Sequence, residues 1–234
     1  MTYDCVVQTV ANNQLVPDKV NVNWKTFAPN IKRVVMSDKE CIEFLREEYN
    51  EDYVNKFNYF EEGAHKADLF RYAWLYKRGG VYMDIKTQLI KPFEDLFPNK
   101  DICYIVVTDP SMCGGRANRI YNGIIATPPF NILIFYMLMG TMQMTNAKPY
   151  LTNCEQGYAI LKSYFQKNIR TGVNTTNRHH PDGFDVCVYT EVELKNRVPK
   201  NLCNKLDRYG HCTYVVKDNI PIIKIRYHDY PWVK

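Results

Sequence analysis

The chain has 234 residues and a formal net charge of +5, with 46% apolar and 24% charged residues. These values are near globular averages, so they exclude a disordered chain, and no basic run indicates nucleic-acid binding. The longest apolar stretch, Ile132 to Met139, is too short to span a bilayer. We therefore expect one domain over residues 1–234, without a transmembrane anchor.

The eight cysteines contain no C-x-x-C pair and no zinc-type spacing. Free buried thiols in a reducing compartment explain them most simply. The opening sequence, MTYDCVV, lacks the basic and apolar regions of a signal peptide. The sequence therefore predicts a cytoplasmic protein.

Taken in chain order, the apolar periodicities predict alternating strands and helices. We expect strands near 4–10, 32–36, 81–84, 102–107, 119–126, 186–189, 212–217 and 221–226, and helices near 39–49, 51–57, 64–78, 129–145 and 155–169. Asp38 is expected to begin the first of these helices, and Thr152 or Asn153 to cap the last. Residues 170–185 are predicted to form a long polar loop. This alternation predicts the α/β class, with a mixed central sheet flanked by helices.

The segment from Ala64 to Thr87 is the most informative part of the chain. It is predicted to form a helix carrying Asp68 and Arg71 on one face, because residues three apart lie side by side. Gly79-Gly80 then provides a left-handed stop, and a buried strand delivers Asp84 and Lys86 at its carboxyl end. Ligands bind at that end of strands in open α/β sheets. Two carboxylates and two cations there suit an anionic, polyhydroxylated ligand such as a nucleotide-sugar.

A structural explanation of the same residues has to be weighed. Asp and Arg at this spacing are more often a solvated surface pair, which stabilises a helix by a few tenths of a kcal/mol. The complete order of the motifs favours a ligand-binding site over such a surface pair. It runs D-x-x-R on a helix, then two glycines, an apolar strand and D-x-K.

This order resembles the DXD-containing sugar-binding region of family 32 glycosyltransferases, which include initiating α-1,6-mannosyltransferases and capsular-polysaccharide enzymes. It is similar, more distantly, to the clostridial glucosylating toxins. The matching positions are Lys66, Ala67, Asp68, Arg71, Tyr72, Leu75, Tyr76, Gly79, Gly80, Val81, Tyr82 and Asp84. Lys86 stands where the family has the second Asp of its DXD motif. The resemblance covers the first hundred residues well and the remainder weakly.

The resemblance implies a GT-A type single domain with a Rossmann-like sheet, in which 1–110 binds the nucleotide-sugar and 111–234 forms the acceptor side and the closing strand. It implies a UDP- or GDP-sugar donor, a glycan, lipid-linked or protein-linked acceptor, and transfer with retention. The implied catalytic residues are Asp68, Arg71 and Asp84. The implied donor-binding residues are these three with Gln8, Thr9, Tyr72, Gly79, Gly80, Lys86 and Trp232. Asp84 and His228 are the implied ligands of a Mn²⁺ or Mg²⁺ ion.

Lys86 leaves three alternatives open. Asp84 and His228 keep the metal while Lys86 points at the phosphate, or Lys86 replaces the metal as a point charge, or the site is inactive and the protein only binds sugar-nucleotide or glycan. We favour retained activity, because Asp68, Arg71 and Asp84 are all present.

Three weaker signals lie outside this segment. His179 and His180 could bind a metal or the acceptor, but adjacent histidines in a polar loop are more often simply exposed. Gln156 and Gly157 mark either a helix start that holds an oxyanion or a plain loop-to-helix junction. Trp24 could stack on a base, but a tryptophan in an amphipathic helix more often lies in the core.

Overall fold

The computed structural model describes residues 2–11, 14–108, 119–146, 151–165, 169, 171–175, 185–193 and 213–225. Its strands are β1 (Cys5–Thr9), β2 (Lys32–Met36), β3 (Gly80–Met83), β4 (Gln88–Leu89), β5 (Cys103–Thr108), β6 (Ile120–Thr127), β7 (Gly172–Thr175), β8 (Asp185–Glu193), β9 (Thr213–Lys217) and β10 (Ile220–Lys224). Its helices are α1 (Asp18–Phe27), α2 (Asp38–Glu48), α3 (Glu51–Tyr59), α4 (Gly63–Arg78), α5 (Phe93–Leu96), α6 (Ile132–Gln143) and α7 (Thr152–Phe165).

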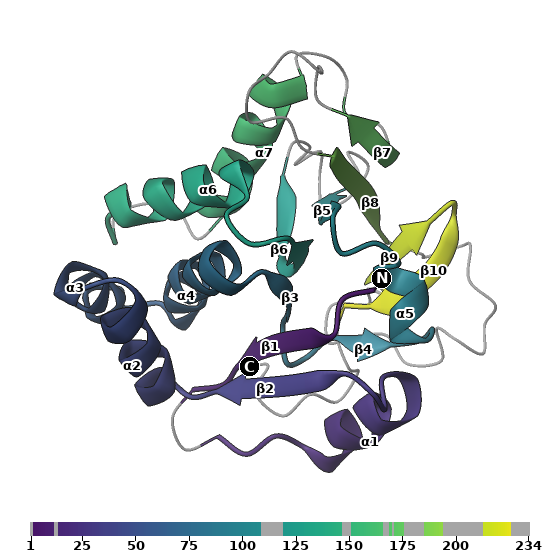
Figure 1. Cartoon of the computed structure of the whole chain (residues 1–234), viewed down its shortest axis with the longest axis horizontal. Coiled ribbons are helices and arrows are strands. Elements are labelled where there is room, and N and C mark those ends of the chain that lie inside the picture. The colour runs from purple at the N-terminus through teal and green to yellow at the C-terminus, as the bar shows by residue number, and fades with distance from the viewer. Residues whose placement is uncertain are drawn as a thin grey trace.

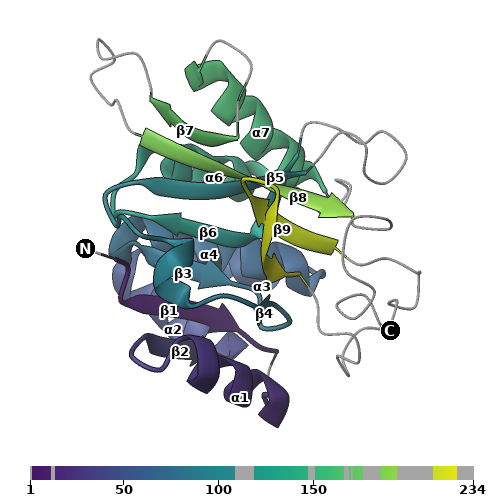
Figure 2. The same ribbon diagram turned by 90° about the vertical axis from the view of Figure 1, so that its right-hand side faces the viewer.

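These strands form one mixed sheet in the order β2-β1-β3-β6-β5-β8-β9-β10-β4, with β7 paired to β8 (Figure 2). β1 is parallel to β2 and to β3, and β5 is parallel to β8. β6 runs antiparallel between β3 and β5. The carboxyl ends of β1, β3, β5 and β8 consequently meet at one edge of the sheet, where α/β proteins bind ligands.

Helices cover both faces of the sheet (Figure 1). Side chains alternate between the faces along each strand, so Val7 and Tyr82 join one core cluster while their neighbours Val6 and Val81 join the other. The first cluster packs against α2, α3, α4, α6 and α7, and the second packs against α1 and α5. The predicted α/β class with a Rossmann-like mixed sheet flanked by helices is confirmed.

The end of α4 follows its predicted stop signal. The amide of Gly79 donates to the carbonyl of Leu75, and Gly79 adopts φ +64°, a conformation that favours glycine. A Cβ at Gly79 would also lie 2.7 Å from the backbone nitrogen of Pro129, so a larger residue does not fit. The helix therefore ends at Arg78 and the chain turns directly into β3.

Several predicted elements need correction. The predicted helices and strands omitted α1, β4 and α5, and the predicted loop over 170–185 contains β7, which pairs with β8. Asp38 does begin α2, but the capping side chain belongs to Ser37, which exchanges hydrogen bonds with Glu40. Gln156 and Gly157 lie inside α7 rather than at its start.

None of the helices in the described ranges is both long enough and apolar enough to cross a membrane.

Candidate functional site

The helix α4 and the strand β3 bring three predicted residues together. An Nη atom of Arg71 lies 3.3 Å from Oδ1 of Asp68, one turn earlier on α4, and 3.5 Å from Oδ1 of Asp84, which follows β3. The side chains of Asp68 and Arg71 are 8% and 5% exposed. The solvated surface pair that the spacing alone favoured is therefore absent, because this pair is buried.

The carboxylate of Asp84 also contacts Lys86 and two phenols. Nζ of Lys86 lies 3.1 Å from Oδ2. The hydroxyls of Tyr82 and Tyr121 donate to Oδ1 and Oδ2 over 3.1 and 3.4 Å. The amide of Thr87 donates to the carbonyl of Asp84 over 2.9 Å, which closes a tight turn around Lys86. This turn directs Lys86 back towards the carboxylate.

Residues after position 110 hold Asp68 and Arg71 in place. Nδ2 of Asn153, on α7, donates to Oδ2 of Asp68 over 2.7 Å, and Nδ2 of Asn122, on β6, donates to Oδ1 over 3.4 Å. The backbone carbonyl of Asn122 accepts a hydrogen bond from Arg71. The guanidinium also lies over the ring of Tyr82, 4.2 Å from its centre. The prediction of Asn153 as a cap is therefore wrong, since Asn153 lies within α7 and its side chain contacts the site.

The electrostatics of the two carboxyl groups differ. Burial by itself would raise the pKa of Asp84, but the Lys86 ammonium and the Arg71 guanidinium outweigh it and lower that pKa to about 2. Burial raises the pKa of Asp68, and Arg71 and Asn153 oppose this effect only in part. Asp84 is thus an anion at neutral pH, whereas Asp68 is the more easily protonated hydrogen-bonding group.

Gly123 lets β6 approach Asp84. Its carbonyl accepts from the amide of Asp84 over 2.8 Å. A Cβ at Gly123 would lie 2.7 Å from Oδ2 of Asp84 and would also overlap the ring of Tyr121. Only glycine fits here without moving the carboxylate. A glycine inside an apolar strand is a sequence signal for such an approach, and Gly123 within β6 carries it.

Three other predicted donor-binding residues lie near the site, but their side chains are buried or contact neighbouring protein groups. Gln8 is fully buried, and its amide nitrogen donates to the carbonyl of Met83 over 3.1 Å. The hydroxyl of Thr9 lies 3.0 Å from that of Tyr82. Tyr72 is fully buried in the core. Gln8 and Thr9 thereby support β3 and its tyrosine from the neighbouring strand.

Gly79 and Gly80 lie at the amino end of β3, whereas Asp84 follows its carboxyl end. The structure does not bring these glycines together with Asp84, and their positive φ angles of 64° and 93° explain them as the helix-to-strand turn. His228, Trp232, His179 and His180 lie outside the described residues.

An acidic residue that the sequence did not single out lies on the same edge of the sheet. Glu191 is opposite Thr108 in the β5–β8 register and accepts a hydrogen bond from its hydroxyl over 2.8 Å. Burial raises the pKa of Glu191, while Thr108 and the charge of Lys86 act in the opposite direction. Lys86 therefore interacts with Glu191 as well as with Asp84.

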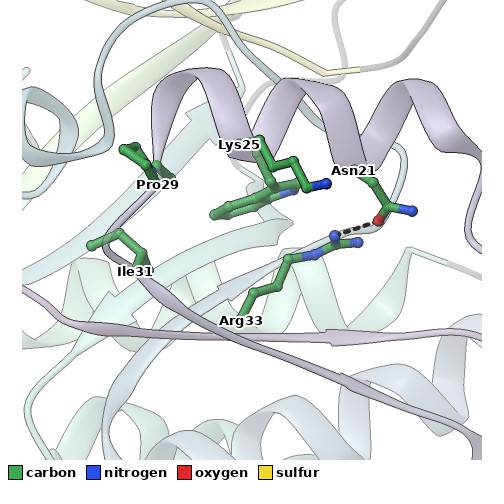
Figure 3. Close-up of a pocket in the computed structure, with 7 residues that line it drawn as sticks. Asn21, Lys25, Pro29, Ile31 and Arg33 are labelled. Carbon is green, nitrogen blue, oxygen red and sulfur yellow. Dashed lines mark hydrogen bonds between the residues drawn. The ribbon is translucent and has the colours of Figure 1, made fainter.

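A cavity of about 490 Å³ lies between α1 and β2, bordered by Trp24, Lys25 and Arg33 among others (Figure 3). Arg33 points along it towards α1, where Nη1 donates to Asn21 over 2.8 Å. Nε of Arg33 donates to Oε1 of Gln8 over 2.6 Å. The cavity thus touches the site only indirectly, through the Gln8 side chain. Trp24 is 4% exposed, which supports its assignment to the core over base stacking.

The side chains at this edge fit a divalent cation poorly. Magnesium and manganese prefer several oxygen ligands, and both oxygens of Asp84 are already in contact with cations or phenols. Within the described ranges, no group of three or more His, Cys, Asp and Glu side chains is arranged to hold a metal ion.

The comparisons with known proteins all find glycosyltransferases. Residues 16–112 match the family described as glycosyltransferase sugar-binding region containing DXD motif. The fold is similar to the solved structure of "PaToxG Glycosyltransferase", with a TM-score of 0.51 and 16% identity over 69% of this chain and 68% of that one. The chain therefore shares the fold of that structure, in line with the GT-A type of fold that the sequence resemblance implies.

Two relatives are both initiation-specific alpha-1,6-mannosyltransferases. The chain is 33% identical to that of Candida albicans over 86 residues, and 32% identical to that of Saccharomyces cerevisiae over 97 residues. These matches cover 36% and 39% of this chain but only 22% and 20% of the relatives. The resemblance to DXD-type glycosyltransferases is thus confirmed, and its matched region contains Asp68, Arg71 and Asp84.

Proposed function

We propose that the protein is a glycosyltransferase that moves a sugar from a UDP- or GDP-sugar to a hydroxyl group of a glycan, lipid-linked or protein-linked acceptor. The observation that carries this proposal is the buried contact of Arg71 with both Asp68 and Asp84, at distances of 3.3 and 3.5 Å. It lies at the ligand-binding edge of a GT-A-type sheet, within the region that matches the family.

The chemistry of glycosyl transfer matches this set of charges. The bond between the anomeric carbon and a diphosphate oxygen breaks, a bond to the acceptor oxygen forms, and the acceptor proton passes to the released nucleoside diphosphate or to solvent. Negative charge grows on the diphosphate while the sugar gains oxocarbenium character. Asp68 and Arg71 bind hydroxyls of the donor sugar, Asp84 binds the ribose, and Lys86 faces the diphosphate. Retention of anomeric configuration is carried over from the resemblance.

The alternative is a non-catalytic relative that binds a sugar-nucleotide or a glycan without transfer. The observation that favours it is Lys86 in place of the second aspartate of the DXD motif. The presence of Asp68, Arg71 and Asp84 together, in contact at 3.3 and 3.5 Å, supports transfer instead.

Calorimetric titration with a panel of UDP-, GDP- and TDP-sugars, combined with an assay for released nucleotide, tests the proposal. Selective binding with slow release of nucleotide, even to water, is the expected result. Binding without any release, also in the presence of acceptor glycans, would favour the non-catalytic alternative. Failure to bind every donor would contradict both.

The remaining assignments rest on the sequence. We propose one domain over 1–234, with 111–234 forming the acceptor side and Trp232 contributing to the donor site. The predicted sharing of a metal ion between Asp84 and His228 stays a prediction, because His228 lies outside the described residues. A cytoplasmic location stays a prediction from composition.

A further inference from the structure

Lys86 occupies a defined position at the more exposed side of the charged cluster. The turn closed by Thr87 holds it beside Asp84, with Nζ 3.1 Å from Oδ2. Its side chain is 28% exposed, compared with 5% for Arg71. Among these two cations, Lys86 is therefore the one that a bound ligand can reach from solvent.

The formal charges of the four ion-paired side chains balance because of this lysine. Asp68 and Asp84 bring two negative charges and Arg71 and Lys86 bring two positive ones, whereas Glu191 lies outside these ion pairs although its carboxyl group interacts with Lys86. An aspartate at position 86, as in the family's DXD motif, would leave two negative charges in excess. A divalent cation would neutralise that excess. Replacing aspartate with lysine at position 86 therefore raises the formal charge of the site by two units, as a bound divalent cation does in a DXD site.

The contacts of Asp84 also argue against a divalent cation at this carboxylate. Its Oδ1 lies near Arg71 and the Tyr82 hydroxyl, and its Oδ2 near Lys86 and the Tyr121 hydroxyl. A divalent cation at this carboxylate would have to displace these groups and would repel both cations. It would also find one carboxylate where the DXD motif offers two.

Given the proposed function, we infer that the Lys86 ammonium binds the donor diphosphate directly and that donor binding requires no divalent cation. A lysine acts on phosphate as a flexible point charge, which suits this role. Lys86 then stabilises the negative charge that develops on the leaving diphosphate. Arg71, which is buried on the other oxygen of Asp84, adds a second positive charge nearby.

The test uses the full chain and two probes, UDP and GDP, titrated calorimetrically in Mn²⁺ and in EDTA. For the nucleotide that binds, affinity in the two buffers should agree within about twofold, a difference well below 1 kcal/mol. Lys86→Met should weaken binding roughly ten- to hundredfold in both buffers, the usual effect of losing a hydrogen bond to a charged group. Lys86→Asp should bind weakly in EDTA and recover with Mn²⁺.

The matched control is Lys91→Met, which removes an exposed lysine shortly after β4 and should leave affinity unchanged. Electron paramagnetic resonance of Mn²⁺ adds a readout without nucleotide, since only Lys86→Asp should reduce the free-ion signal. Wild-type binding that disappears in EDTA, or full binding by Lys86→Met, would overturn the inference and leave the proposed function intact. No binding of either nucleotide by the wild type would overturn both.

Discussion

The Asp84 carboxylate lies between two cations, and its low pKa links the site to the stability of the fold. A folded pKa of about 2 is below the unfolded value of about 3.9. The ionised form therefore stabilises the fold above pH 3.9, on the order of 2 kcal/mol at neutral pH, and this contribution disappears as the pH falls through 2.

Removal of the Lys86 charge should remove part of this stabilisation. Lys86→Met raises the folded pKa of Asp84, because burial then acts against one cation fewer. Urea unfolding should show a loss on the order of 1 kcal/mol at pH 7 and a much smaller loss near pH 2, where Asp84 is about half protonated in the wild type and more fully protonated in the variant. Lys91→Met should lose nothing at either pH. An equal loss at both values would show that packing, not charge, explains the effect.

The buried pair of Asp68 and Arg71 leads to a second prediction at this scale. Asp68→Asn keeps the shape and can still accept from Asn153, but it removes the charge beside Arg71. Affinity for the nucleotide-sugar should fall roughly ten- to hundredfold, while affinity for the free nucleoside diphosphate changes little. Parallel titrations of the sugar-nucleotide and its nucleotide measure this difference, with the exposed Asp95→Asn as control. Equal losses for the two ligands would remove Asp68 from the sugar subsite.

At the scale of elements, β6 packs closely against the residues that follow β3, and Gly123 allows this contact with Asp84. A Cβ at Gly123 would lie 2.7 Å from the Asp84 carboxylate, so Gly123→Ala should push Asp84 or Tyr121 out of place. We expect at least about a tenfold loss of donor affinity and a fall of about 1–3 kcal/mol in unfolding free energy. Gly63→Ala is the matched control, because nothing lies within 4 Å of a Cβ there. Unchanged donor affinity in Gly123→Ala would show that Asp84 tolerates displacement.

The element boundaries also show which parts of the fold local sequence can predict. The helix α4 and its glycine stop were predicted because capping, charge and apolar spacing all act within a few residues. α1 was omitted because its run of valines and asparagines forms helices poorly, and Pro17 provides no capping side chain. Tertiary contacts stabilise α1 instead: Trp24 is buried, and the Asn23 side chain pairs with the backbone of Leu89.

The same limit applies to the site. Asp68, Arg71 and Asp84 could be predicted because one helix and the next strand carry them. Asn122, Asn153 and Glu191 could not, since they reach the site through the pairing of β6 with β3, the pairing of β8 with β5 and the packing of α7. A buried asparagine inside a helix has no signal of its own in a single sequence, and Asn153 therefore looked like a cap.

At the scale of the whole molecule, the two predicted halves share both the sheet and the site. β6 lies between β3 and β5, so a strand from 111–234 separates two strands from 1–110. Asn122 and Asn153, also from 111–234, hold the side chains of Arg71 and Asp68. The proposed donor site therefore depends on residues from both halves of the chain.

A fragment of residues 1–110 should consequently fail to bind the donor, even though it carries Asp68, Arg71 and Asp84. Without β6, the edges of β3 and β5 lack their hydrogen-bonding partner and the apolar face of α4 that packs on α6 is exposed. Circular dichroism should show no cooperative thermal unfolding of the fragment, and calorimetry no binding of the nucleotide that the full chain binds. Co-expression with 111–234 should restore both properties, because the missing strand and the two asparagines are then supplied. A fragment that folded and bound alone would mean that β3 and β5 pair directly and that Asn122 and Asn153 are dispensable.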